Sequence, residues 1–383
     1  MAVKIVRQIS QIALLGAPTS AAALSPGHEG APAALRAAGL VERLKTVGYT
    51  VTDLGDDPPQ LYKPDNESPR ARNLSGVLAS IEALKPRVEQ AVKTGALPLI
   101  LSGDRSIALA TVAGARRYFR EVGMIYFERE AGLQTPATTS TGRVDGMVVS
   151  HLTGQGAAEM VRFWGEPPLV REPGLALFGV GQLSAMEEDT LRHSTLRSYP
   201  AADVRRMGAA AAARAALERI HGTSHAFVLH LGVDAIADFQ ATDDPGTDGL
   251  SLEEVRAALE VFVKEPHLAA LEVSAYNPAK DSGEGGAKTI VELLAEVLGK
   301  RLEALEAAAP AKPAAIEPGP SAAATAAPIA PPAENEPGLP APAPGEAWSS
   351  ESLEVTVETA EPAGEPASAE AQEAPEESGE PSS

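Results

Sequence analysis

Acidic and basic residues stand in two short loops, each directly after a run of apolar residues that indicates a buried strand. The first loop, 102–106, reads Ser-Gly-Asp-Arg-Ser and contains Arg105. The second loop, 128–132, contains Glu128 and Glu130, two residues apart. In α/β proteins, ligands and catalytic groups gather in the loops at the carboxyl ends of the strands. We therefore expect these two loops to form a polar site.

The two glutamates permit two kinds of chemistry. Residues two apart in extended chain point to the same side, so Glu128 and Glu130 could act as a carboxylate pair whose like charges push their pKa values apart. In the other interpretation, Arg105 holds them in a set of ion pairs. Asp234, which follows a third predicted strand, either binds a cation or anchors its loop. The residues alone leave both alternatives open.

Several common catalytic motifs are missing from the sequence. It contains no cysteine, which excludes disulfides, thiolate metal sites and a cysteine nucleophile. The pair Gly179 and Gly181 lacks the third glycine and the downstream acid of a dinucleotide-binding fingerprint. Neither a P-loop nor a Gly-x-Ser-x-Gly elbow is present. The polar loops are therefore the main candidates for chemistry.

The stretches between these loops predict the elements that position them. Short apolar runs alternate with stretches that carry apolar residues at helical spacing. This alternation predicts an α/β fold in which a mainly parallel sheet lies between layers of helices. Strands are expected at 12–16, 49–54, 175–181, 226–232 and 268–274, with two more and a helix inside 97–136. Further helices are expected at 33–47, 74–94, 157–164, 187–193, 208–220, 252–263 and 288–306.

Charge and composition divide the chain into two parts. Its 383 residues carry a net charge of −20, and the stretch from Pro310 to the end holds fourteen glutamates against one lysine. Proline, alanine, glutamate, serine and glycine dominate this stretch. Such a composition cannot bury enough apolar surface to offset the entropy lost on ordering. We predict one domain over 1–306 and a disordered acidic tail over 307–383.

The same composition limits the partners that the protein can have. No basic patch marks a nucleic-acid-binding face, and no stretch approaches the roughly 20 apolar residues that span a membrane. The N-terminal segment lacks the apolar run and the cleavage site of a signal peptide. The sequence predicts a soluble, cytoplasmic protein that binds neither nucleic acid nor a membrane.

Five short blocks resemble, in their order and spacing, those of the arginase, agmatinase and formiminoglutamase (ureohydrolase) family. They lie within a stretch from residue 12 to about residue 300. The resemblance implies a three-layer α/β/α fold around a central, mainly parallel sheet. The blocks are LGAPTS at 15–20, SGDRSI at 102–107, IYFEREAGLQTP at 125–136, LGVDAI at 231–236 and SAYNP at 274–278.

The resemblance also implies where a metal centre would be. Family members that work as enzymes are binuclear manganese hydrolases, in which a metal-bridging hydroxide attacks a guanidino or amidino carbon. Of the six ligand positions in this chain, one keeps the family's residue, two keep a carboxylate, and three cannot ligate. The residues at these positions are Arg105, Glu128, Glu130, Gly132, Gly232 and Asp234.

Charge argues against two metal ions at these positions. Two Mn²⁺ ions about 3.5–4 Å apart need several anionic ligands to offset their mutual repulsion. Glu128, Glu130 and Asp234 supply at most three, and the guanidinium of Arg105 stays positive at any working pH. We predict a metal-free pocket without a cofactor or a catalytic residue, in which Arg105 pairs with Glu128 or Asp234. If manganese binding is retained, Glu128, Glu130 and Asp234 are its expected ligands.

Two functions remain open at this point. The first is a catalytically inactive pseudoenzyme with a binding, scaffold or regulatory role. The alternative is a divergent metal-dependent hydrolase of guanidino or amidino C–N bonds. The resemblance implies assembly into a homotrimer or homohexamer. The pseudoenzyme hypothesis also allows a hetero-oligomer with an active homologue.

Overall fold

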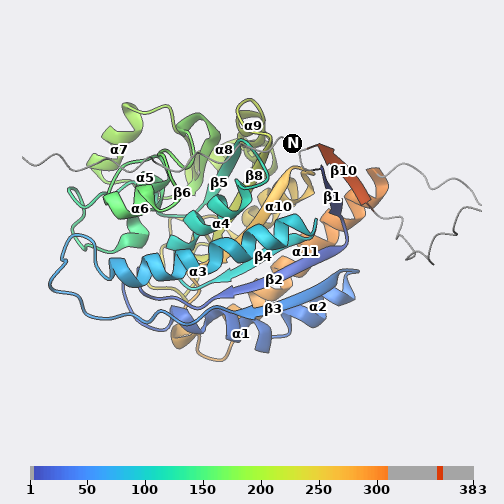
Figure 1. The fold of residues 1–383 in the computed structure, drawn as a ribbon, viewed down its shortest axis with the longest axis horizontal. Helices are drawn as coiled ribbons and strands as arrows, with labels where there is room; N and C mark the ends of the chain where they lie inside the picture. The colour runs from blue at the N-terminus through green and yellow to red at the C-terminus, as the bar shows by residue number, and fades with distance from the viewer. Residues whose placement is uncertain (1–3, 309–351, 357–383) are drawn as a thin grey trace, which may run out of the picture.

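The computed structural model describes residues 4–308 and 352–356 (Figure 1). The tail predicted over 307–383 lies outside the described residues, apart from its first two residues and strand β10 (Ser352–Thr356). The division into a domain over 1–306 and a disordered tail therefore stays a prediction. Within the described part, no helix is long and apolar enough to cross a membrane.

An eight-stranded sheet forms the centre of the molecule, and every neighbouring pair of its strands is parallel. The order across the sheet is β3-β2-β4-β9-β8-β5-β6-β7. This confirms the predicted α/β class. The strands are β2 (Gln11–Ala17), β3 (Thr50–Asp56), β4 (Leu97–Ser102), β5 (Val122–Phe127), β6 (Leu175–Val180), β7 (Arg197–Pro200), β8 (Ala226–Gly232) and β9 (Leu268–Ser274).

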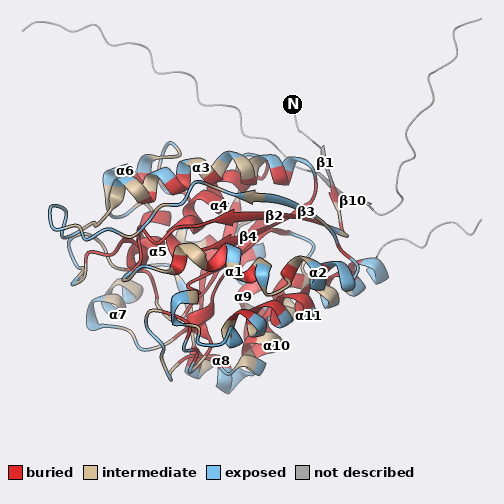
Figure 2. Ribbon diagram, turned by 90° about the horizontal axis from the view of Figure 1, so that it is seen from below, coloured by how far each residue is buried: buried red, intermediate tan, exposed pale blue. Residues whose placement is uncertain are grey.

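Helices cover both faces of the sheet and enclose a separate hydrophobic core on each side. Successive strand residues point to opposite faces, so Tyr126 belongs to one core and Phe127 to the other. Figure 2 shows the result, with a buried sheet and helices that are exposed on their outer sides only. On one face lie α1 (Ala31–Ala37), α2 (Leu40–Thr46), α8 (Ala201–Met207), α9 (Ala209–His221), α10 (Leu252–Lys264) and α11 (Gly285–Ala308). On the other lie α3 (Leu74–Lys93), α4 (Ala108–Ala115), α5 (Val148–Leu152) and α6 (Ala158–Arg162).

Two local features differ from the sequence-based expectation. The single helix expected over 33–47 is two helices, because Gly39 adopts a left-handed φ of 89° between α1 and α2. The edge strand β7 and helix α8 were not expected, since β7 has only four residues and one of them is buried. Helix α7 (Ala185–Arg192) lies on the surface and has no buried residue.

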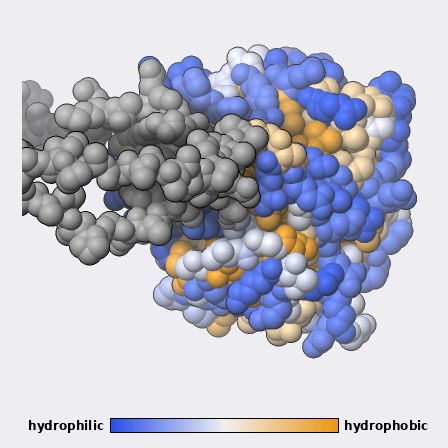
Figure 3. All heavy atoms as spheres, turned by 90° about the vertical axis from the view of Figure 1, so that its right-hand side faces the viewer, coloured by the Kyte–Doolittle hydropathy of each residue, from blue (hydrophilic) through white to orange (hydrophobic). Residues whose placement is uncertain are grey.

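A small second sheet lies at the end of the molecule where the central strands begin. Strand β1 (Lys4–Gln8) pairs antiparallel with β10, from Lys4 opposite Thr356 to Gln8 opposite Ser352. Figure 1 shows this pair beside the last turns of α11. Figure 3 views this end of the molecule, where hydrophobic residues form small patches between hydrophilic ones on the visible surface.

Candidate functional site

The four central strands of the sheet bring the predicted polar loops together. Strands β4, β9, β8 and β5 are consecutive neighbours, so the loops that follow them meet at one edge. Arg105 starts a 3-10 turn after β4, Glu128 follows β5, and Asp234 lies in a 3-10 turn after β8. All three side chains are buried. The parallel sheet therefore converts residues far apart in sequence into one cluster.

Asp104 shapes the turn that directs Arg105 into this cluster. Its carboxylate accepts hydrogen bonds from the backbone N–H of Ser106 at 3.0 Å and of Ala22 at 3.0 Å, and from the hydroxyl of Thr19 at 3.1 Å. An aspartate that bonds the amide two residues ahead forms an Asx turn. Arg105 is next in the chain and points inward.

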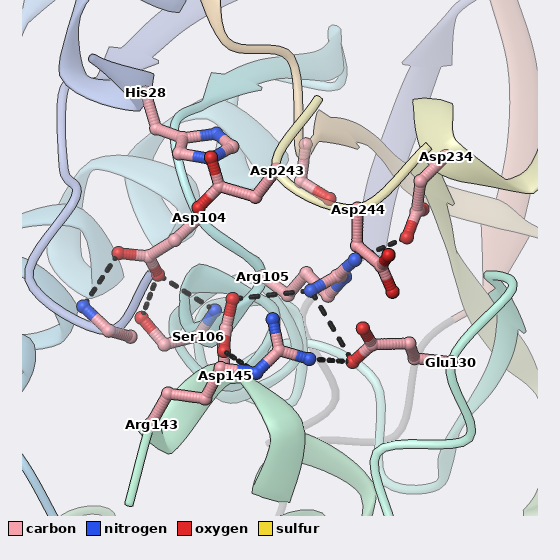
Figure 4. Close-up of polar contacts among 12 residues, drawn as sticks. His28, Asp104, Arg105, Ser106, Glu130, Arg143, Asp145, Asp234, Asp243 and Asp244 are labelled. Atoms are coloured by element: carbon pink, nitrogen blue, oxygen red, sulfur yellow. Dashed lines mark hydrogen bonds and ion pairs between the residues drawn. The ribbon is translucent and has the colours of Figure 1, made fainter. Parts of the chain in front are cut away.

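The guanidinium of Arg105 contacts four carboxylates, and Figure 4 shows its contacts with Asp145, Glu130 and Asp234. Its Nε lies 3.0 Å from Glu128 Oε2, and its Nη2 donates a short hydrogen bond to Asp234. Its Nη1 lies 3.2 Å from Asp145 Oδ2 and 3.7 Å from Glu130 Oε2. The pairing of Arg105 with Glu128 and Asp234 that we predicted is therefore present. A guanidinium suits this place because it offers five donors in a fixed plane.

A second ion-paired chain runs from Glu128 into the sheet. The imidazole of His230 lies between two carboxylates, with Nε2 3.0 Å from Glu128 Oε1 and Nδ1 2.9 Å from Glu272 Oε1. Its ring stacks on Tyr126 at 4.8 Å, and Thr111 donates a hydrogen bond to Glu272. These side chains are fully buried. His230 is thus a core residue with both ring nitrogens paired, and it links the cluster to the interior.

Gly232 makes room for the carboxylate of Glu128. A Cβ atom built on Gly232 would lie 1.8 Å from Glu128 Oε1 and 2.0 Å from its Cδ. The φ of Gly232 is −86°, an ordinary value for any residue, so space and not backbone conformation requires the glycine. In the family that the five blocks resemble, the position of Gly232 is occupied by an aspartate, and the position of Glu128 by an acid shorter than glutamate. The longer side chain at 128 fills the volume that the glycine at 232 leaves.

A second arginine, which the sequence analysis missed, completes the cluster. Arg143 donates a short hydrogen bond to Glu130, and its Nε lies 3.5 Å from Asp145 Oδ1. Glu272 was missed as well. The signal for Glu272 was present, since it is the one charged residue in the apolar run 268–274. Arg143 and Asp145 gave no such signal, because they lie in a polar loop.

The burial of so many charges shifts their pKa values in opposite directions. Burial alone would raise the pKa of Glu128, but Arg105 outweighs it and holds that pKa well below its usual range. Burial raises the pKa of Asp234 well above the usual value and that of Asp145 to about 6. Burial would lower the pKa of His230, yet Glu272 and Glu128 raise it to about 9. His230 is therefore a cation at neutral pH.

Above this cluster lies a second polar group from other loops (Figure 4). Asp243 lies 3.1 Å from His28 Nε2 and 2.9 Å from Lys280 Nζ, and it accepts a hydrogen bond from the Ser25 hydroxyl. Burial would raise the pKa of Asp243, but hydrogen bonding from His28 lowers it far below the usual value.

The described side chains do not surround a metal ion at this end of the sheet. Glu128 and Asp234 face Arg105, Glu130 faces Arg143, and Gly132 and Gly232 offer no ligand atom. Among the described residues, three potential ligand atoms come within 4.8 Å of one another in one group only, at the opposite end of the sheet. In this arrangement the candidate ligand side chains are held in ion pairs with the two arginines.

Comparisons with known proteins identify relatives over most of the described chain. The model of the Arginase family matches residues 10–299. An arginase from Bacillus subtilis (strain 168) is 29% identical over 296 residues, which cover 76% of this chain and 98% of the relative. An arginase from Bacillus caldovelox is 27% identical and covers 76% of this chain and 99% of its own.

Solved structures agree with these sequence relatives. The crystal structure of Bacillus subtilis arginase has a TM-score of 0.69 at 28% identity, covering 76% of this chain and 98% of that one. The structure of formiminoglutamase from Trypanosoma cruzi, solved with Mn²⁺, has a TM-score of 0.60 at 18% identity, covering 76% and 93%. The second likeness shows the fold alone.

These relatives contradict our expectation that no cofactor binds. That expectation rested on six positions, whereas the comparisons align the chain with arginases over nearly their whole length and point to a manganese cofactor. The physical reason for the error is the negative charge that remains. Five buried carboxyl groups and the partly buried Glu130 lie near two arginines and one histidine, namely Asp104, Glu128, Asp145, Asp234 and Glu272 near Arg105, Arg143 and His230.

Sequence, fold and strand order thus lead to one conclusion. The five blocks occupy the family's order, the parallel sheet carries its loops at one edge, and the family model matches residues 10–299. The chain belongs to the arginase family.

Proposed function

We propose that this member of the arginase family is a binding protein that does not hydrolyse guanidino compounds at an arginase's rate. The observation that carries the proposal is the guanidinium of Arg105, which contacts four carboxylates at the carboxyl edge of the sheet. The relatives named arginase imply a guanidino substrate. In this chain a guanidinium of its own lies among the carboxylates of the cluster.

Electrostatics support this proposal. Removing Arg105 from the cluster would leave Glu128 and Asp234 as neighbouring buried acids without their main partner, and a buried ion without its partner is destabilising by about 3–5 kcal/mol. An incoming metal ion or guanidino group can compensate these acids only by displacing the Arg105 side chain. Arg105 thus competes with every cation that approaches the cluster.

Manganese, to which the relatives point, would be held by Glu128, Glu130 and Asp234 in place of Arg105. Their hard carboxylate oxygens suit Mn²⁺. When bound, such an ion lowers the pKa of its water and so supplies a nucleophile. In this chain, the supporting groups are His230, which orients Glu128, and Arg143, which orients Glu130.

The alternative function is hydrolysis of a guanidino or amidino C–N bond. Two observations favour it: the relatives are arginases, and the cluster keeps more carboxyl groups than cations. The Oδ1 atom of Asp234 is buried and accepts no hydrogen bond within the described structure, so it is available to a cation.

Urea release from L-arginine distinguishes the two functions. The full chain is loaded with excess Mn²⁺, dialysed, analysed for manganese per chain, and assayed beside Bacillus subtilis arginase. We expect a rate at least about 1,000-fold below that enzyme, because Arg105 blocks the approach of both ions and substrate. A rate within about tenfold of the enzyme would favour the hydrolase.

The variant Arg105→His tests the reason for the low rate. An imidazole removes the fixed charge and adds a ligand that manganese sites accept. We expect the affinity for Mn²⁺ to rise at least about tenfold over that of the wild type. Arg129→His is the matched control, because Arg129 pairs with Asp244 and Asp248 outside the cluster. Equal affinities in all three proteins would overturn the role of Arg105.

Assembly and location stay predictions of this proposal. We propose a homo-oligomer, a trimer or hexamer, or a hetero-oligomer with an active homologue, in the cytoplasm. Light scattering coupled to size-exclusion chromatography measures the number of chains in the assembly. In a hetero-oligomer, the active homologue would supply the hydrolytic activity that this chain lacks.

A further inference from the structure

Two histidines and a glutamate form a second group of potential ligands, at the edge of the sheet where the strands begin. His221 is the last residue of α9. Glu265 and His267 flank Pro266 in the turn between α10 and β9. One nitrogen of each histidine and one carboxylate oxygen of Glu265 lie within 4.8 Å of one another. Neither the expected manganese site nor the Arg105 cluster includes these residues.

The ligand atoms of this group are spaced nearly as they would be around one metal ion. Glu265 accepts from His267 Nδ1 at 2.8 Å, and its other oxygen lies 3.7 Å from His221 Nε2. The two imidazole rings are 5.8 Å apart at an angle of 70°. Ligand atoms around one tetrahedral zinc ion are roughly 3.3 Å apart. Small side-chain rotations would therefore bring all three atoms to one ion.

The backbone that carries the group is well fixed. Arg301 donates hydrogen bonds to the carbonyls of Val263 and Glu265, the latter at 2.9 Å. The carbonyl of His267 accepts from the N–H of Phe227 at 3.1 Å, which joins the turn to the first residues of β8. Proline at 266 restricts the turn further. Only the side chains have to move.

Exposure and charge both leave room for a cation. The side chains of His221, Glu265 and His267 are 39%, 18% and 50% exposed, so an ion can reach them and keep a water ligand. His221 ends a helix of thirteen residues, where the helix dipole is negative. Arg7, which lies close to His267, and Arg301 oppose the ion. Both arginines donate to backbone carbonyls and do not approach Glu265 as ion-pair partners.

We propose that His221, Glu265 and His267 bind one divalent transition-metal ion of the zinc type, with water as the fourth ligand. Two imidazoles and one carboxylate are ligands that Zn²⁺ accepts in tetrahedral sites with an open position. Mn²⁺ is a weaker occupant, because affinity at nitrogen-containing sites rises from manganese to zinc. The ion joins the end of α9 to the start of β9 and so stabilises this edge of the sheet.

Zinc titration of the full chain tests the site. ZnCl₂ is added to metal-free protein in a calorimeter, and the melting temperature is measured with and without zinc. We expect one ion per chain at this site and a melting temperature that rises with zinc concentration. In His221→Ala and in His267→Ala, zinc affinity should fall at least about tenfold. Both variants replace partly exposed side chains, so their folds should remain intact, and circular dichroism checks this.

The matched control is His193→Ala. His193 lies at the end of α7, and its Nδ1 is 3.5 Å from Asp189 Oδ1, a histidine and carboxylate pair without a second histidine. This variant should bind zinc as the wild type does. The Co²⁺-substituted protein gives an independent readout, since four-coordinate cobalt absorbs strongly in the visible and the His221→Ala variant should lose that band. Equal zinc binding by the wild type and the His221→Ala/His267→Ala double variant would overturn the proposal, as would no binding by the wild type.

Discussion

The two ends of the central sheet treat similar side chains in different ways. At the carboxyl edge, buried acids are paired with arginines and a histidine, and few of their atoms are free. At the opposite edge, two histidines and a glutamate are partly exposed and share one close contact. The cause of this difference is burial. A charged group removed from water needs an oppositely charged partner within the fold, whereas an exposed group is solvated by water and stays free to bind a ligand.

The largest difference in stability between the two edges is expected when a buried cation is removed. Arg105→Met should lower the free energy of unfolding by about 3–5 kcal/mol, since it leaves several acids without their common partner. Urea denaturation at pH 7 measures it. At the opposite edge, His221→Ala should change stability by no more than about 0.5 kcal/mol in the absence of metal.

Arg129→Met is the matched control for Arg105→Met. Arg129 also pairs with two acids, but Asp244 and Asp248 are 58% and 39% exposed. The loss should stay below about 1 kcal/mol. If the two arginine variants lose the same stability, the buried cluster is not held together by Arg105.

A smaller effect comes from filling the space beside Glu128. Gly232→Ala should destabilise by about 1–3 kcal/mol, because the new Cβ overlaps the carboxylate of Glu128. Adding Glu128→Asp shortens the acid, so the double variant should lose less than the sum of the two single variants. Gly285→Ala serves as control, since a Cβ there meets nothing within 4 Å. If the stability losses of the two single variants are strictly additive in the double variant, the side chain at 128 does not fill the space beside position 232.

The pH dependence of stability sharpens the role of His230. The pKa of His230 is raised in the folded state to about 9 from about 6.5 unfolded. Its stabilising contribution is therefore complete below pH 6.5 and is lost as pH rises through 9, by an amount on the order of 3 kcal/mol. The pKa of Asp145 is about 6, so this carboxyl group titrates at the acid limit of the pH range over which His230 loses its charge.

Denaturation of the wild type and His230→Gln at intervals from pH 6 to 9.5 measures this contribution. The gap between the two proteins should narrow as pH rises. A gap that stays constant would mean that His230 is neutral in the folded protein and acts through packing and hydrogen bonds alone.

The sequence predicted the sheet better than the cluster. Buried parallel strands are continuous apolar runs, which is why 226–232 and 268–274 were identified with their bounds. The pairing of Arg105 with Glu128 and Asp234 was also predictable, because the loops after neighbouring strands meet. Positions in the cluster that come from a long polar loop, Arg143 and Asp145, were not, since only the tertiary structure brings that loop to the strand ends.

The cofactor was predicted wrongly for a related reason. Counting ligands at six positions ignored acids that the fold adds from elsewhere, above all Asp145 and Glu272. It also ignored how many arginases the chain resembles as a whole. The His221 group was missed because its members are exposed residues in a helix end and a turn, which have no periodic signal.

The smallest expected effect concerns the acidic tail. The hydrophobic cores of the described structure end at Leu305 and at Ala270. Strand β10 pairs only with β1, in a two-stranded sheet, which is marginally stable by itself. Deleting residues 310–383 should therefore shift the melting temperature by less than about 2 °C. Deleting 357–383, which keeps β10, is the control. A larger drop with the first deletion alone would show that pairing of β10 with β1 is part of the domain and would move its boundary beyond 306.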